Sequence, residues 1–311
     1  MTQTSRLYWL HGLSPLHVGA GEGVGAIDLP IMREKATQWP MIPGSSIKGV
    51  QRDYYLTRTE DEKWINRAFG TGGDQDANAG ALVMTDSRIL AFPVGSRYGT
   101  FAYVTCPLVL KRMRRDVKSA GLEAAIPLLE QLDIFDRQLV EGTVQAWVAK
   151  GSVLGNLKGE ATEATGQVYL DEFEGTARVQ ENFTAWAAAV GKQLFEKNTE
   201  EREIWQQRII LVSDDTFQYF VTMCCEIEPR IRINEETKTV KKGALWYEEY
   251  VPTEAVFYGM IWCDQVSKRF ADAERDEMLG TLAKESILQI GGNASVGKGR
   301  MRCLIPKGGK A

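Results

Sequence analysis

A long segment rich in glycine and proline follows the first strand expected in this sequence, and it limits the folds that the chain can adopt. The strand is predicted at Leu7–Leu13, where apolar and polar residues mix in a short stretch. The next segment, residues 14–44, has glycines at 19, 21, 23 and 25 and prolines at 15, 30, 40 and 43. Loops of that length inside a compact domain are usually functional or disordered. Apolar residues such as Ile27 and Trp39 favour a packed, functional loop.

The composition is that of an ordinary folded protein, with enough apolar material for one large domain with insertions or for two small ones. Of the 311 residues, 44% are apolar and 25% are charged. No apolar run approaches the roughly 18 residues that a membrane helix needs, and residues 1–6 lack the layout of a secretory signal. We therefore expect a cytoplasmic protein without a membrane partner. The five cysteines form no CxxC pair, which predicts neither a zinc site nor a redox motif.

Charge is unevenly distributed along the chain. The formal net charge of −4 argues against nucleic-acid binding when it is taken alone. Basic residues nevertheless gather at 33–52, 111–118, 230–242 and 298–310, and acidic residues at 60–62, 160–181 and 214–215. Such runs are usually solvated faces, but a basic stripe on an acidic body can also bind phosphate locally.

The other periodic segments alternate between strand and helix patterns. A helix is expected at Ile47–Leu56, with Ser45 or Ser46 as its cap. This helix places Lys48 and Arg52 on one face. The order strand, helix, strands, helix, strand predicts a ferredoxin-like α+β unit, occurring once or twice. The remaining predictions are strands at Ala81–Asp86 and Phe101–Cys106, a basic helix from Pro107, a mixed region at 121–207, a strand at Arg208–Ser213, a helix that Asp214 or Asp215 caps and that runs to Cys225, a hairpin at Arg230–Tyr250, a strand at Ala255–Trp262, a helix at Lys268–Leu288 and a strand at Arg300–Ile305.

A second glycine-rich loop, GGNASVGKGR, contains GxxxxGK at Gly292–Lys298, as a phosphate-binding P-loop does. In a P-loop a serine or threonine and then a helix follow, whereas here Gly299 and the strand-like MRCLI follow. We therefore reject a nucleotide hydrolase. Two interpretations remain, a structural turn or a turn whose backbone approaches an RNA backbone closely. The RNA-binding residues would be Gly291, Gly292, Gly297, Lys298 and Arg300.

The first glycine-rich loop carries the best catalytic candidate. Its GAGEGVGAID lacks the GxGxxG spacing of a dinucleotide site, because Val24 stands where a glycine is required. Asp28 lies between apolar residues in this loop, as either a metal ligand, a general base or an ordinary turn aspartate. Of the two histidines, His17 starts the loop and is a better candidate for proton transfer than His11, which lies in the first strand. No Ser/His/Asp or Cys/His hydrolase arrangement is supported.

Three stretches of sequence point to a known family. They are LHVGAGEGVGAIDLPIMREKATQWPMIPGSSIKGVQRD at 16–53, RIRINEETKTVKKGALWYEEYVP at 230–252 and QIGGNASVGKGR at 289–300. Together they closely resemble RAMP proteins, and specifically the backbone subunit of Cmr-type (type III-B) CRISPR effector complexes. The related subunit of Csm-type complexes shares the glycine-rich loop, the aspartate and PGSSIKG. The longer chain and the segment LPIMREK favour the Cmr type.

The resemblance implies a single RAMP domain over residues 1–311, with a ferredoxin-like (RRM-related) palm and inserted finger and thumb elements. The insertions would be the loop at 14–44, a helical middle insertion at about 121–207 and a thumb-like hairpin at about 230–250. Copies of the subunit would form a filament along a guide RNA, together with other Cmr-type subunits. Each thumb would displace a nucleotide of the guide–target duplex, and the target RNA would be cut beside each displaced position.

The resemblance also assigns the candidate site residues. The family's catalytic aspartate falls on Asp28, which would also bind the divalent metal, Mg or Mn, that cleavage requires. The supporting residues fall on His17, Glu248 and Tyr250, although Glu249 is an equally plausible acid. Two rivals remain open, an RNA-binding scaffold without cleavage and a RAMP-fold endonuclease that processes guide RNA alone.

Guide sequences vary, so guide binding should rest on phosphates, 2′-hydroxyl groups and shape. The residues predicted to contact the RNA backbone are Lys48, Arg52, Lys298 and Arg300, with Arg230, Arg232, Lys241 and Lys242 near the thumb.

Overall fold

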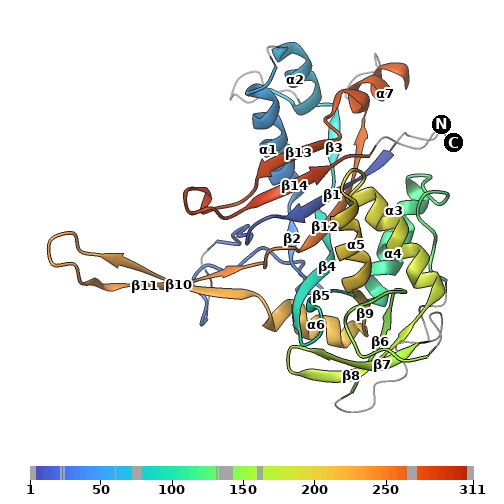
Figure 1. The fold of residues 1–311 in the computed structure, drawn as a ribbon. Coiled ribbons are helices and arrows are strands. Elements are labelled where there is room, and N and C mark those ends of the chain that lie inside the picture. The colour runs from blue at the N-terminus through green and yellow to red at the C-terminus, as the bar shows by residue number, and fades with distance from the viewer. Residues whose placement is uncertain are drawn as a thin grey trace.

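The computed structural model describes residues 5–21, 23, 25–59, 61–71, 79–130, 132, 143–159, 164–264 and 272–306. They form a body of sheets and helices from which one long hairpin projects (Figure 1). The hairpin consists of β10 (Glu226–Ile233) and β11 (Val240–Tyr250), which pair antiparallel. The hairpin predicted at Arg230–Tyr250 is confirmed, and its first strand begins four residues earlier.

One half of the body is an antiparallel sheet in the order β13-β14-β1-β12-β4. The predicted first strand is the central strand of this sheet. Its residues from Leu7 to Gly12 are accordingly buried. The helix α1 lies between β2 and β3 in the chain, and α7 lies between β12 and β13. The bounds are β1 Ser5–Gly12, β2 Met41–Ile42, α1 Gly44–Leu56, β3 Leu82–Met84, β4 Ser87–Ser96, β12 Val256–Cys263, α7 Asp272–Thr281, β13 Glu285–Gln289 and β14 Arg300–Leu304.

The other half is a ring of strands that continues from β4. Its order is β4-β5-β9-β6-β8-β7, and β7 pairs back with β4 at Ser96 and Leu170. This pairing gives the sheet a barrel-like form. The bounds are β5 Thr100–Thr105, β6 Thr143–Val148, β7 Thr165–Leu170, β8 Phe173–Val179 and β9 Ile209–Leu211.

The remaining helices of the described residues, α2 to α6, cover the two halves (Figure 1). Their bounds are α2 Glu62–Phe69, α3 Pro107–Ser119, α4 Glu181–Leu194, α5 Thr199–Arg208 and α6 Asp214–Met223. The helix predicted from Pro107 begins there, because proline at the first turn has no N–H to leave unpaired. It buries Val109, Leu110, Met113 and Val117 on one face.

Both predicted helix caps are wrong. At α1 the cap position is held by Pro43, and the Asp86 carboxylate accepts the Gly44 N–H at 2.9 Å in place of a serine. At α6 the cap is Ser213, whose hydroxyl accepts the Thr216 N–H at 3.1 Å. The acceptor at the start of α1, Asp86, is distant in the sequence, so the local pattern around Gly44 could not identify it.

The helix predicted at Lys268–Leu288 is also wrong in its second half. The helix ends at Thr281, and Glu285–Gln289 is a strand that alternates exposed and buried residues beside β14. The start of that prediction, at 268–271, lies outside the described residues. The middle insertion at 121–207 contains β6, β7 and β8 as well as α4 and α5, so its description as helical was incomplete.

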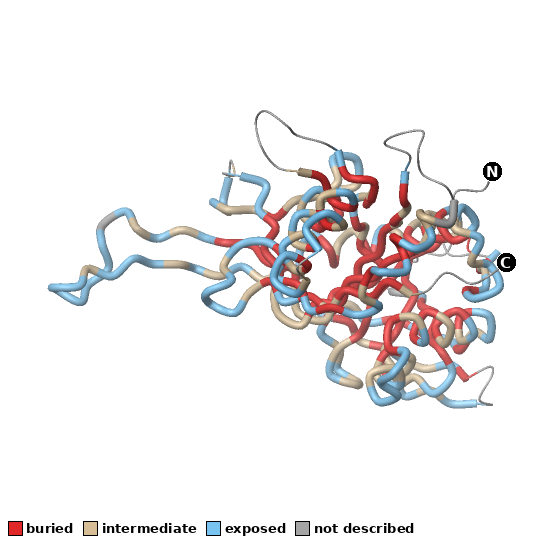
Figure 2. Tube along the Cα trace, turned by 90° about the horizontal axis from the view of Figure 1, so that it is seen from above, coloured by how far each residue is buried: buried red, intermediate tan, exposed pale blue. Residues whose placement is uncertain are grey.

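The buried apolar side chains of the sheet and of the ring belong to one continuous cluster. Figure 2 shows this buried trace running through the body, whereas the outer part of the hairpin is exposed. Trp9 in β1 and Trp205 in α5 are among its largest fully buried side chains. None of the described helices combines the length and the apolar character that spanning a bilayer demands.

Candidate functional site

Asp28 lies at the root of the projecting hairpin. The residues around it run alongside β11, where Leu29 donates its N–H to the Tyr247 carbonyl at 3.1 Å and accepts the Glu249 N–H at 3.0 Å. The Asp28 carboxylate extends this ladder, because its Oδ2 accepts the Tyr247 N–H at 2.8 Å. The side chain is exposed. The carboxylate is therefore fixed in direction and open to solvent.

The sequence of the hairpin allows residues 28 and 29 to pair with β11. Pro229 stands opposite Tyr247 in the β10–β11 pair, and proline has no N–H to donate across the pair. Tyr247 directs its own N–H and carbonyl to Asp28 and Leu29 instead. The turn before Asp28 requires a glycine, since a Cβ at Gly23 would lie 2.4 Å from the Ile27 carbonyl oxygen.

Glu248 and Tyr250 form a buried network on one face of β11. The Tyr250 hydroxyl donates to Glu248 Oε2. Arg230 on β10 donates to both, at 3.1 Å to Glu248 Oε2 and 3.0 Å to the Tyr250 hydroxyl. The indole N–H of Trp246 donates to the other carboxylate oxygen, Oε1, at 2.8 Å.

The network sets the charge of its members. Burial disfavours ionisation of Glu248, but hydrogen bonds from Tyr250, Trp246 and Arg230 outweigh it and hold the pKa of Glu248 below its usual range. Burial, and then the hydrogen bond to Glu248, raise the pKa of Tyr250. The pair therefore consists of a carboxylate and a neutral phenol near neutral pH.

Glu249 is committed to a different partner. Successive side chains of a strand point to opposite faces, and Glu249 accordingly turns away from Tyr250. Its Oε1 forms an ion pair with Arg33 at 2.5 Å, and its Oε2 accepts the Ile31 N–H at 3.0 Å. Sequence left Glu248 and Glu249 equivalent, whereas the structure groups Glu248 with Tyr250 and places Glu249 in a buried ion pair.

His17 is buried beside this network. Its Nδ1 donates to the Glu249 carbonyl at 2.7 Å, and its ring centre lies 5.4 Å from that of Tyr250. The bond to a carbonyl places the proton on Nδ1, so Nε2 carries the lone pair when the ring is neutral. His11, expected to be structural, is buried in β1 and bonded to Glu254 at 2.8 Å.

The second glycine-rich loop, residues 291–299, closes over His17. Gly292 donates its N–H to the His17 carbonyl at 2.9 Å. Gly291 has a φ of +78°, and a Cβ there would lie 2.2 Å from the His17 carbonyl oxygen. The structure adds Asn293, which sequence reasoning missed and whose amide donates to Glu248 and Tyr250. An asparagine within a glycine-rich turn was the available signal, because asparagine tolerates positive φ.

Two of the predicted RNA-binding cations are engaged within this site. Lys298 pairs with Glu228, and its Nζ lies 4.5 Å from the centre of the Tyr250 ring. Arg230 binds Glu248 and Tyr250 as described above. Arg300, at the end of the loop, is exposed.

The other predicted cations lie elsewhere. Arg232 and Lys241 are exposed on the outer part of the hairpin, and the side chain of Lys242 lies outside the described residues. The helix α1 packs mainly against α2, β3 and β13. Its Lys48 is half-buried, which lowers the pKa of that side chain, and Arg52 donates to the Gly70 carbonyl at 3.3 Å. These two form a surface separate from the hairpin root.

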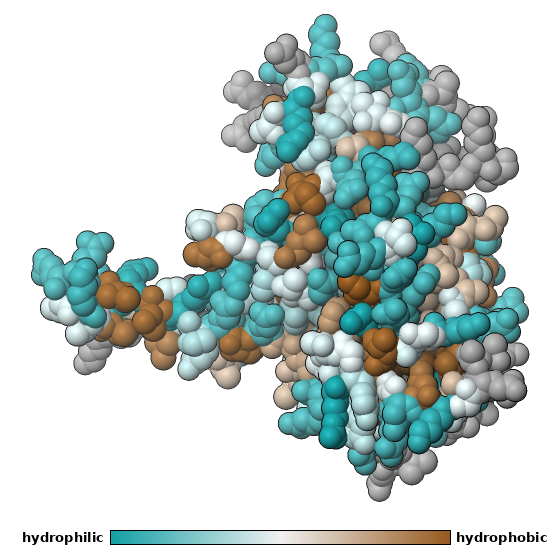
Figure 3. All heavy atoms as spheres, viewed as in Figure 1, coloured by the Kyte–Doolittle hydropathy of each residue, from teal (hydrophilic) through white to brown (hydrophobic). Residues whose placement is uncertain are grey.

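Beyond its root the hairpin exposes apolar side chains, visible as brown atoms on the projecting element in Figure 3. The exposed aliphatic side chains of β10 and β11 are Ile227, Ile231, Ile233, Val240 and Leu245, and Tyr247 is exposed at the root. Single exposed apolar residues are common, but a row of them on one projecting element marks a contact surface.

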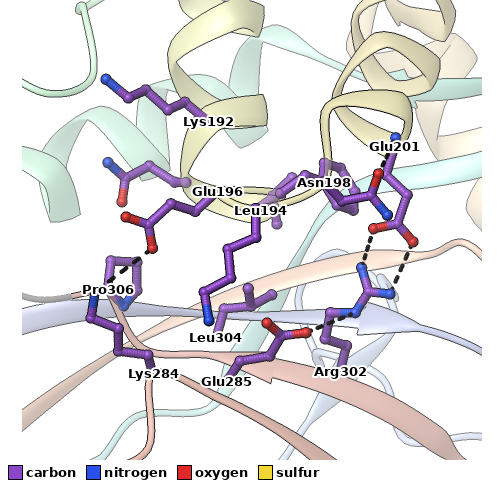
Figure 4. A pocket seen from close by; sticks show the side chains of 13 residues that line it. Lys192, Leu194, Glu196, Asn198, Glu201, Lys284, Glu285, Arg302, Leu304 and Pro306 are labelled. Carbon is purple, nitrogen blue, oxygen red and sulfur yellow. Dashed lines mark hydrogen bonds and ion pairs between the residues drawn. The ribbon is translucent and has the colours of Figure 1, made fainter.

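A cavity of about 340 Å³ lies apart from this site, between the α4–α5 connection and the β13–β14 edge (Figure 4). Arg302 in its wall is bound to Glu201 by hydrogen bonds of 2.6 and 2.9 Å and lies 3.5 Å from Glu285. Lys284 lies 3.9 Å from Glu196 in the same wall. The cavity contains none of the predicted site residues.

Asp28 is the residue that would hold a divalent metal, together with phosphate oxygens and water. No group of three His, Cys, Asp or Glu residues in the described part of the chain converges on a metal position. Mg²⁺ is commonly held by one or two carboxylates together with substrate phosphates and water. Asp28 offers one such carboxylate, already oriented by Tyr247.

Comparisons with known proteins agree with the resemblance in the sequence. The model of the RAMP superfamily matches residues 9–302. The chain is 37% identical to the CRISPR system Cmr endoribonuclease Cmr4 of Pyrococcus furiosus, over 96% of this chain and 95% of that protein.

A crystal structure of oligomeric Cmr4 from the same organism aligns with a TM-score of 0.65 and 30% identity, over 99% of this chain and all of that one. The match to the Csm3 endoribonuclease of Mycobacterium tuberculosis, at 34% identity, spans 25% of this chain and 38% of that protein. The Cmr-type resemblance is thereby confirmed over the Csm-type alternative. The chain has a mixed α+β RAMP fold and belongs to the RAMP superfamily, within the family of Cmr4 subunits of CRISPR systems.

Proposed function

We propose that this chain is the backbone subunit of a Cmr-type, RNA-guided complex that binds guide RNA along a filament and cleaves complementary target RNA at regular intervals. The main observation in favour of cleavage is the position of Asp28. Its carboxylate is exposed, held by the Tyr247 N–H and located at the root of the hairpin. The name of the Pyrococcus furiosus relative, an endoribonuclease, supports the same activity.

RNA supplies the nucleophile for the reaction. When a nucleotide is turned out of helical geometry, its 2′-hydroxyl can align with the adjacent phosphorus, opposite the leaving 5′-oxygen. Asp28 takes the proton of the 2′-hydroxyl as the new O–P bond forms. The bond to the 5′-oxygen breaks, and that oxygen takes a proton from solvent, which leaves a cyclic phosphate and a 5′-hydroxyl.

Glu248, Tyr250 and His17 support this step. Because Glu248 and Tyr250 are bound to each other and to Arg230, we assign them to holding the root of the hairpin, where Asp28 is bound to Tyr247. His17 holds the turn of the glycine-rich loop through its Nδ1 and its carbonyl.

We further propose that cleavage depends on a divalent ion, Mg²⁺ or Mn²⁺, shared between Asp28 and the RNA. Such an ion would supply positive charge for the phosphate oxygens as negative charge develops on them. Asp28 holds its direction toward that position through the Tyr247 N–H.

The shape of the molecule is consistent with guide and target binding. We infer a ferredoxin-like palm, supported by the strand order β14-β1-β12-β4 with α1 and α7 between its strands. The exposed apolar hairpin would be the thumb that separates bases of the duplex. The loop at 291–299 and the predicted cations would follow the RNA backbone. The complex would act in the cytoplasm, where its target transcripts are present.

Mapping the ends of target RNA after incubation with the assembled complex tests the proposal. We expect a ladder of cuts at constant spacing that requires Mg²⁺ or Mn²⁺ and disappears with a chelator. A complex that binds target RNA without cutting it would identify the chain as a scaffold. Guide processing by the chain alone, without copurifying subunits, would support the solitary endonuclease instead.

A further inference from the structure

The loop between β13 and β14 contacts each of the three residues assigned to support Asp28. Gly292 binds the His17 carbonyl through its N–H at 2.9 Å. The side-chain amide nitrogen of the next residue, Asn293, lies 2.8 Å from Glu248 Oε2 and 2.8 Å from the Tyr250 hydroxyl. One short turn therefore joins residues that are far apart in the sequence.

The backbone of Asn293 aims its amide at this pair. The residue has φ of +62° and ψ of 29°, a left-handed conformation that asparagine and glycine adopt more readily than other residues. Its carbonyl accepts the N–H groups of Val296 and Lys298 at 3.1 and 3.2 Å. These two bonds close the turn on itself and fix the backbone of Asn293, from which the side chain reaches Glu248 and Tyr250.

The chemistry of the amide suits the two atoms that it meets. An amide nitrogen carries two N–H groups, one for the carboxylate oxygen and one for the phenol oxygen. Arg230 reaches the same two atoms from the hairpin. The Glu248–Tyr250 pair is therefore held between a donor on the hairpin and a donor on the loop.

We propose that Asn293 is a positioning residue for RNA cleavage, which fixes Glu248 and Tyr250 against the glycine-rich loop so that the hairpin root keeps its place beside Asp28. This inference rests on the proposed function. No proton transfer is assigned to Asn293, because its amide neither gains nor loses a proton in the reaction.

Substitution by glycine separates the effect of the Asn293 side chain from that of its left-handed backbone. Asn293→Gly tolerates the left-handed conformation and removes both donors. Asn293→Asp also suits that conformation, but it replaces the donor with an oxygen and adds a negative charge beside Glu248. The matched control is Asn198→Gly, which removes an asparagine that caps α5 through the Glu201 N–H, on another part of the surface.

The first measurement follows Glu248 directly and needs no cleavage. The Trp246 indole N–H donates to Glu248 Oε1, so its NMR signal in the full-length chain reports the ionisation of that carboxylate. The signal is assigned by its loss in Trp246→Phe. We expect the titration midpoint to rise in Asn293→Gly and to rise further in Asn293→Asp, because a donor to the charged form is lost and then a like charge is added. Asn198→Gly should keep the wild-type midpoint.

The second measurement is the pH dependence of target-RNA cleavage by the assembled complex. We expect Asn293→Gly to lower kcat by up to about 100-fold with little change in KM, and to move the acid limb of the profile with the indole midpoint. An unchanged midpoint, or a wild-type kcat in Asn293→Gly, would overturn the inference. The two proposals can fail separately. If the midpoint shifts in Asn293→Gly but the wild-type complex does not cut RNA, the contact of Asn293 with Glu248 stands and the proposed function is refuted.

Discussion

The carboxylate of Asp28 accepts the backbone N–H of Tyr247 at 2.8 Å, although the two residues lie 219 positions apart in the sequence. This bond attaches the first glycine-rich loop to the strand that carries Glu248 and Tyr250. It leaves the carboxylate exposed while fixing its direction, so a substitution at Asp28 tests chemistry with little effect on folding.

We expect Asp28→Asn to abolish cutting while assembly and RNA binding continue. The amide oxygen can still accept the Tyr247 N–H, so the loop should keep its place, but an amide cannot take the proton of a 2′-hydroxyl. The loss of a general base typically costs about 10²–10⁴ in rate. Single-turnover cleavage measures it, with RNA affinity and thermal unfolding of the same preparation as controls. Cutting at the wild-type rate would refute the role of Asp28.

Glu228 should compete with RNA for Lys298. The two side chains are paired in the structure, and Glu228 also lies 3.3 Å from Arg230. We expect Glu228→Gln to bind RNA more tightly and to steepen the salt dependence by about one phosphate contact, near 0.7–0.9 in the log–log slope. Fluorescence anisotropy over a salt series measures this effect. Glu235→Gln removes an exposed charge from the same hairpin and serves as the control; equal slopes in both variants would contradict the competition.

Glu249 should matter for stability rather than for chemistry. Removing one member of a buried ion pair leaves the other charge uncompensated, typically at a cost of roughly 3–5 kcal/mol. Glu249→Ala should therefore lower the free energy of unfolding by an amount of that order, since Arg33 loses its carboxylate partner and the Ile31 N–H loses its acceptor. Urea unfolding measures the loss. A variant as stable as wild type would show that the pair contributes little.

The low pKa of Glu248 gives the folded chain a defined acid sensitivity. A carboxyl whose pKa is lower in the folded state than its usual value of 4.5 stabilises the fold above that value, and the contribution is lost as the pH falls through the folded pKa. The free energy of unfolding should therefore decrease from about pH 5 downwards. Glu248→Gln should flatten this part of the profile, whereas Glu235→Gln should not. Parallel profiles for wild type and Glu248→Gln would contradict the assignment.

Two glycines of the second loop allow steric contact to be separated from backbone strain. Gly291 and Gly297 both have positive φ, but an added Cβ lies 2.2 Å from the His17 carbonyl at Gly291 and in open space at Gly297. Gly297→Ala should cost about 1–2 kcal/mol of stability from conformation alone. Gly291→Ala should cost more and also displace His17. Thermal unfolding ranks the two, and equal losses would show that the approach to His17 is unimportant.

Local patterns predicted the elements that local sequence determines. The hairpin was recognisable from its alternating Ile231 and Ile233 and its polar turn, and α3 from Pro107. The pattern predicts helix through Leu288, but Glu285–Gln289 is a strand because pairing with β14 decides its conformation. Closure of the ring at Ser96 and Leu170 likewise depends on a contact between distant residues.

The candidate site shows the same division. The loop pattern left Asp28 as a metal ligand, a general base or an ordinary turn aspartate, and the family resemblance assigned it the catalytic role. The structure places it at the hairpin root. The choice between Glu248 and Glu249 required knowledge of which face of β11 turns toward residues 291–299. That orientation is set by Arg33 on one side and Asn293 on the other, and neither is adjacent in the sequence.

The outer hairpin, from Ile231 through the turn to Leu245, is exposed on both strands. It therefore contributes little to the folding of the body, and its length and apolar content can change without unfolding the rest of the chain. Amide hydrogens there should exchange rapidly in the isolated protein, while those of β11 near Tyr250 stay protected. The length of the hairpin can therefore vary independently of the body, while its base stays packed against the body.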